Sequence, residues 1–84
     1  MNKEETFEII DLLKSGKQFK QGHYISGYVY YFYNKEKNCF VEKTEDMGID
    51  MYNPSVEEKE YQQNQFIEKF LLPHPFKEFK SFLI

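Results

Sequence analysis

The ten residues Tyr24–Tyr33, with the sequence YISGYVYYFY, decide the fold, because six of them are aromatic, as is typical of a β-strand, and both faces of such a strand would be apolar or aromatic. A strand in a small two-layer domain normally buries only one of its two faces. Ile25 and Val29 suit a buried face, which also holds Tyr31 and Tyr33. We therefore expect the other face, with Tyr24, Ser26, Tyr28, Tyr30 and Phe32, to be left without helical cover.

Hydrophobic residues at helical spacing predict helices on both sides of this strand, at residues 4–14, 55–71 and 76–83. The first has an apolar stripe that includes Phe7 and ends at Gly16, a residue suited to a left-handed helix terminus. In the second, Ser55 and Glu58 form a capping-box pattern. Prolines at positions 73 and 75 end it.

The remaining segments predict a small antiparallel sheet around the aromatic strand. Residues 17–21 and 39–44 have the character of strands, and residues 34–38 form a polar loop of hairpin length. A short fourth strand at residues 49–52 is also expected. The chain is thus predicted to be a single compact α+β domain over residues 1–84, in the order α-β-β-β-α-α, with three or four strands and the helices packed on one face.

The charge of the chain is uneven, because residues 42–60 hold seven acidic side chains and two lysines, a net charge of −5 within a total of −3. A protein that binds double-stranded DNA directly usually carries the opposite bias, so this activity is not expected. The chain has no arginine and therefore no bidentate clamp for phosphate or carboxylate. The acidic segment indicates either a solvated surface or a basic protein partner, such as the basic cleft of a nucleic-acid-handling enzyme. Its acidic residues are Glu42, Glu45, Asp46, Asp50, Glu57, Glu58 and Glu60.

Catalytic and metal-binding patterns are not found in the sequence, so we expect neither an enzyme nor a cofactor. His23 and His74 have no partner at metal-ligand spacing, and no serine lies in a nucleophile elbow. Cys39, the only cysteine, lies in a predicted strand and is expected to be a buried structural thiol. The single cysteine and the lack of a long apolar run indicate a cytoplasmic protein without a membrane segment.

Two surfaces remain as candidates for a binding function, the uncovered aromatic face and the acidic segment. The leading hypothesis is a small, non-enzymatic protein-binding module, for which an inhibitor or regulator from a phage or mobile element is the concrete form. Codon usage implied by the many Lys, Asn, Ile, Tyr and Phe residues indicates an AT-rich bacterial or phage genome. The candidate partner-binding residues are Tyr24, Tyr28, Tyr30, Glu45, Asp46, Asp50 and Glu57.

Three other interpretations stay open at this point. The tyrosines can serve packing alone, or they can pair two copies in a homodimer. They can also stack a nucleotide or single-stranded nucleic acid on Tyr28, Tyr30 and Tyr33.

Two phage protein families share features with the chain. Its helix–strands–helix–helix order and acidic second half resemble those of small anti-CRISPR inhibitors that occupy nucleic-acid clefts. Separately, the segment Leu12–Lys17 with its following strand is similar to the opening of the anti-Thoeris nucleotide sponges, without the basic pair and tryptophan expected after it.

Overall fold

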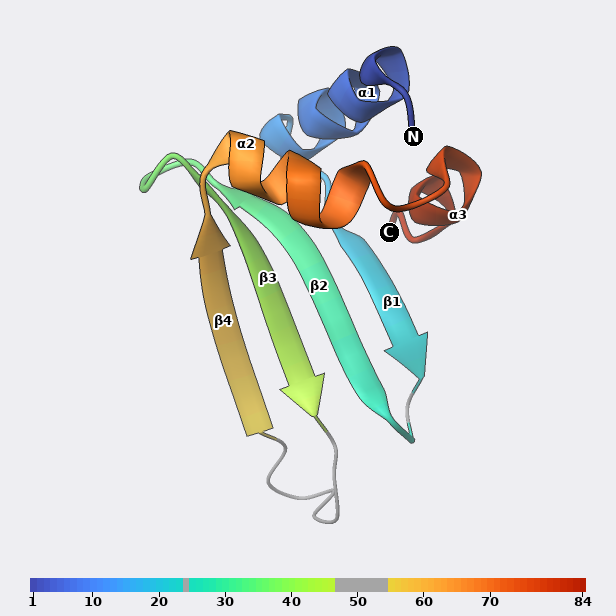
Figure 1. The fold of residues 1–84 in the computed structure, drawn as a ribbon. Helices are drawn as coiled ribbons and strands as arrows, with labels where there is room; N and C mark the ends of the chain where they lie inside the picture. The colour runs from blue at the N-terminus through green and yellow to red at the C-terminus, as the bar shows by residue number, and fades with distance from the viewer. Residues whose placement is uncertain (24, 47–54) are drawn as a thin grey trace.

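A four-stranded antiparallel sheet forms the centre of the fold in the computed structural model, which describes residues 1–23, 25–46 and 55–84 (Figure 1). Neighbouring strands in the sheet are neighbours in the chain, so the sheet is a simple meander. The strands are β1 (Phe19–His23), β2 (Gly27–Asn34), β3 (Cys39–Asp46) and β4 (Ser55–Tyr61). The predicted α+β class with a small antiparallel sheet is confirmed.

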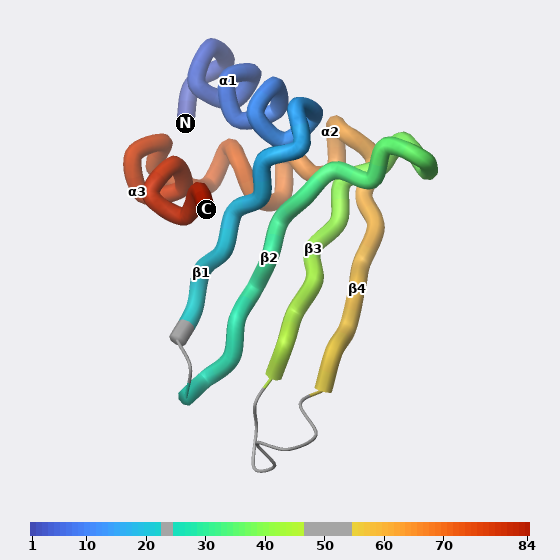
Figure 2. Tube along the Cα trace, turned by 180° about the vertical axis from the view of Figure 1, so that it is seen from behind, coloured from blue at the N-terminus to red at the C-terminus, as the bar shows by residue number. Residues whose placement is uncertain are grey.

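The helices gather on one face of the sheet, at the end where β2 turns into β3 (Figures 1 and 2). The other end of the strands extends beyond them, within a molecule of 40 × 28 × 20 Å. The helical segments are α1 (Lys3–Lys14), α2 (Gln63–Phe66), the π-helical η1 (Ile67–Leu71) and α3 (Phe76–Ser81). Asn2 and Glu5 close the start of α1 with a capping box, and Gly16 follows its end with a φ of 100°.

The expected helix over residues 55–71 is wrong in its first half, because Ser55–Tyr61 forms β4. Every side chain from Ser55 to Glu60 is exposed, so this segment has no apolar stripe with which a helix could pack. As a strand it places Glu58 opposite Lys43 of β3, and Lys59 opposite Glu42. These cross-strand pairs of opposite charge favour the strand. A capping box does form, but between Gln62 and Gln65 at the start of α2. The strand expected at residues 49–52 lies outside the described residues.

Aromatic side chains from both layers make up most of the core. Tyr31 of β2 lies with its ring centroid 5.2 Å from that of Phe70 and 5.4 Å from that of Phe79. Phe40 of β3 stacks on Phe66 at 5.1 Å. Phe7 was predicted to belong to this core, and the prediction is wrong. It is 42% exposed, because α1 turns Thr6, Ile9, Ile10 and Leu13 inward instead.

Gly27 is the first residue of β2. Its φ is 107°, and a Cβ atom there would lie 2.2 Å from the backbone oxygen of Glu45 on β3. Only glycine permits both this conformation and this close approach. The strand predicted from Tyr24 starts at Gly27.

Candidate functional site

The sheet face turned away from the helices holds the candidate site and is called the open face below (Figure 2). The alternation of β2 explains its composition, because Tyr31 points into the core and is 3% exposed, whereas its neighbours Tyr30 and Phe32 are only half-buried. The strand register assigns the rest of the open face. Its main residues are Lys20, Tyr28, Tyr30, Phe32, Val41, Lys43, Glu45, Val56, Glu58 and Glu60.

A row of four side chains crosses the open face through Tyr30, which is paired in register with Lys20 on one side and Lys43 on the other. Glu58 of β4 continues the row beyond Lys43. The Lys20 ammonium lies 4.0 Å from the ring centroid of Tyr28 and 5.5 Å from that of Tyr30. The Lys43 ammonium is 5.9 Å from the Tyr30 ring. The two tyrosine rings thus lie in cation–π contact with ammonium groups of the protein itself.

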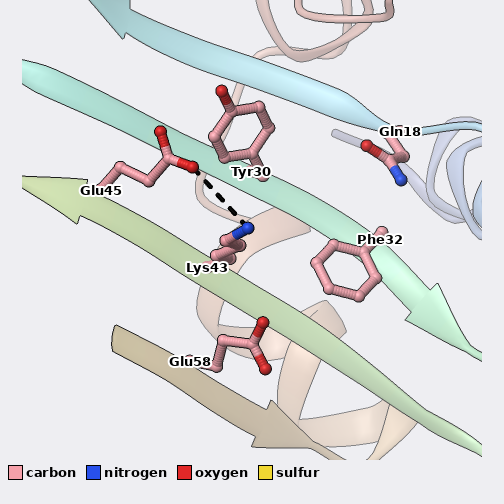
Figure 3. Close-up of a pocket in the computed structure, with 6 residues that line it drawn as sticks. All are labelled: Gln18, Tyr30, Phe32, Lys43, Glu45 and Glu58. Carbon is pink, nitrogen blue, oxygen red and sulfur yellow. Dashed lines mark ion pairs between the residues drawn. The ribbon is translucent and has the colours of Figure 1, made fainter. Parts of the chain in front are cut away.

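A hollow of about 340 Å³ lies beside this row (Figure 3). Tyr30 and Phe32 form its aromatic walls, and the carboxylates of Glu45 and Glu58 lie on either side of Lys43. The Lys43 Nζ is 3.7 Å from Glu45 Oε1. Within the described chain, the Glu58 carboxylate has no hydrogen bond or ion pair with another residue. Such a hollow suits a group with an apolar body and a polar or cationic end.

The structure brings together three of the predicted partner-binding residues. Tyr28, Tyr30 and Glu45 lie on the open face, on neighbouring strands. Asp46 directly follows Glu45 on β3, and Glu57 directly precedes Glu58 on β4. Because side chains alternate along a strand, both lie on the other face of the sheet. Tyr24 and Asp50 lie outside the described residues, so their predicted roles stay predictions.

Tyr33 does not belong with Tyr28 and Tyr30, contrary to the stacking interpretation. It lies on the helix-covered face, where its ring is 5.0 Å from that of Phe40 and its hydroxyl bonds the Asn38 side chain. A ligand on the open face could therefore stack on Tyr28 and Tyr30 but not on all three tyrosines.

Several residues of the open face were not among the predicted site residues. Phe32 and Lys43 could have been found from the alternation of their own strands. Glu58 was not placed on this face because its segment was predicted to be a helix. Nothing in the sequence pointed to Lys20, because its position beside Tyr28 depends on the register between β1 and β2.

Cys39 is a buried thiol, as predicted, with 3% of its surface exposed. Burial, with a smaller contribution from Glu60, raises the pKa of this thiol. A protonated and inaccessible thiol is a poor nucleophile. Among residues 1–23, 25–46 and 55–84, no group of three His, Cys, Asp or Glu side chains is arranged to hold a metal ion.

Comparison with protein-family models, curated proteins and solved structures found no significant match. No helix in the described part of the chain is long and apolar enough to cross a membrane.

Proposed function

We propose that the chain is a non-enzymatic protein-binding module that docks on its partner through the open face. The observation that carries the proposal is the group of half-buried aromatic side chains, Tyr28, Tyr30 and Phe32, on a sheet face without a covering helix. Tyrosine supplies a large contact area at a small cost in conformational entropy and is enriched at the centres of protein interfaces. The carboxylates of Glu45 and Glu58 beside these rings favour a partner with basic groups at the contact. Inhibition or regulation of a basic, nucleic-acid-handling protein is the specific form of this proposal.

Site-specific photocrosslinking tests the proposal. A benzoylphenylalanine replaces Tyr30 on the open face or, as the control, Lys77, which is exposed on α3. In cells that make the protein, irradiation should join the variant at position 30 to a discrete protein that the control does not capture. The substitution Glu58→Lys in the crosslinking variant should lower the yield, because it reverses a charge beside the hollow. Equal crosslinking from both positions would contradict the proposal.

A second candidate function is the stacking of a nucleotide or single-stranded nucleic acid, favoured by the 4.0 Å contact between the Lys20 ammonium and the Tyr28 ring. Aromatic platforms flanked by cations are typical of single-strand binding sites. Titration with oligothymidylate, followed by tyrosine fluorescence, would detect this activity. Loss of the response in a folded Tyr28→Ala variant would favour this candidate over the protein-binding module. Light scattering on the same samples would reveal the third alternative, pairing of two copies through the open face.

A further inference from the structure

The two edges of the sheet differ in how their backbone groups are satisfied. At β1, the amide of Ile84 donates to the carbonyl of Gln18 at 3.0 Å, and the amide of Lys20 donates to the carbonyl of Phe82 at 2.7 Å. The end of the chain therefore covers the beginning of this edge. In the described chain β4 pairs only with β3, so its outer amides and carbonyls face solvent. An uncovered edge of this kind is a template for another strand.

The charges along β4 limit which strand can pair with it. Three glutamates and one lysine give Ser55–Tyr61 a net charge of −2. On the side of the open face, the strand presents Val56, Glu58 and Glu60 in alternation. Glu60 pairs with Lys37 at 2.8 Å, whereas Glu58 has no ion pair within the described residues. In the antiparallel register centred on Glu58, pairing with β4 of a second copy would place the two Glu58 carboxylates side by side on the open face, so a basic occupant suits this face better.

From this edge we infer an interaction beyond the docking of the open face: β4 accepts an extended, basic segment of a partner protein as a fifth, antiparallel strand. Main-chain hydrogen bonds to β4 would supply the binding energy, and the side chains beside Glu58 and Glu60 would supply the selectivity. These two glutamates are two residues apart on one face, about 7 Å along the strand. Basic residues at alternate positions of the incoming strand match that spacing.

The antiparallel direction predicts the order of residues in the partner segment. The incoming strand meets Glu60 first, then Glu58, then Val56, so its pattern is basic–x–basic–x–apolar. Its intervening residue lies on the other side of the sheet beside Lys59, where a further basic residue would be repelled.

The probe for this inference is the peptide acetyl-Lys-Thr-Lys-Thr-Val-Thr-amide, titrated at millimolar concentration into the isotope-labelled protein. Chemical shifts should change along β4, and hydrogen exchange of its outward amides should slow. Two further peptides carry N-methyl groups at alternate backbone nitrogens, one set facing β4 and the other facing solvent. Only methyl groups on the nitrogens that face β4 remove hydrogen-bond donors to the edge. The peptide with that set should therefore lose binding, and the peptide with the solvent-facing set should keep it.

Charge reversal at the edge provides the matched protein variants. Glu58→Lys with Glu60→Lys should weaken binding at least about tenfold, whereas Glu68→Lys with Glu78→Lys, on exposed helical positions, should have little effect. Tyr30→Ser should leave peptide binding intact, which separates this inference from the docking of the open face. Circular dichroism confirms that each variant is folded. Equal binding of both methylated peptides, or no shift along β4, would overturn the inference and leave the charges as protection against edge-to-edge aggregation.

Discussion

Tyr30 and Tyr31 are neighbours in the chain, yet they lie in two regions of different character. Tyr31 is 3% exposed among Phe66, Phe70 and Phe79, whereas Tyr30 is half-buried between the ammonium groups of Lys20 and Lys43. The alternation of one strand thus sends the same residue type either to the core or to the face that no helix covers. The helices cover one face only, so substitutions of the half-buried residues on the other face should separate stability from binding.

The largest difference between the faces is expected for phenylalanine truncation. Phe79 is fully buried on the covered face, with its ring 5.0 Å from Phe19, and Phe79→Ala should lower the free energy of unfolding by about 3–5 kcal/mol. Phe32→Ala on the open face should cost about 1 kcal/mol, because the side chain is only half-buried in the native state and so less apolar surface is removed from water there. Urea denaturation followed by circular dichroism measures both. Similar losses would mean that the open face is a second core.

Gly27→Ala tests the register that keeps the two faces distinct. The added Cβ would meet the backbone oxygen of Glu45 in a conformation that alanine rarely adopts. We expect a loss of about 3–4 kcal/mol in the free energy of unfolding. Gly16→Ala is the control, since its φ is also positive but no atom lies within 4 Å of the added group. It should cost less than Gly27→Ala, and an equal cost would mean that the contact with β3 contributes nothing.

The ionisation of Tyr31 provides a pH test of the covered face. Burial, followed by the charges of Glu42 and Tyr61, raises the pKa of Tyr31 from its ordinary value of 10.0 to about 12. The unfolded chain loses this proton near pH 10, whereas the folded chain keeps it until about pH 12. The associated stability is therefore fully present below pH 10, and about 2–3 kcal/mol of it is lost as the pH rises to 12.

Tyr31→Phe should remove this part of the alkaline loss in pH-dependent urea denaturation, because phenylalanine has no proton to lose. Tyr30→Phe is the matched control on the open face and should leave the loss in place. An unchanged alkaline profile in Tyr31→Phe would show that other groups cause the loss.

Apolar periodicity predicted the elements of the covered face but not all of its residues, because Phe7 and Ile25, both expected to be buried, are 42% and 67% exposed. Residues 4–14 and the aromatic strand were recognised from it, and the structure places α1 and β2 there with shifted ends. β4 was missed because its exposed, charged side chains carry no periodic apolar signal, so a capping-box pattern at Ser55 outweighed the weak strand alternation. The sites of Lys20 and Glu58 depend on strand register, which a single segment of sequence does not determine.

The smallest effect on stability, and the most informative about binding, is expected for Tyr30→Ser. The substitution removes a ring that no helix covers and keeps a hydroxyl group, so the free energy of unfolding should fall by less than about 1 kcal/mol. Crosslinking from a second position on the open face, benzoylphenylalanine at Phe32, should nevertheless decrease strongly in this variant, because central aromatic residues dominate the energy of an interface. Lys77→Ser serves as the control for both measurements. A large loss of stability with unchanged crosslinking would mean that Tyr30 serves packing, and that the open face is not the surface that the partner contacts.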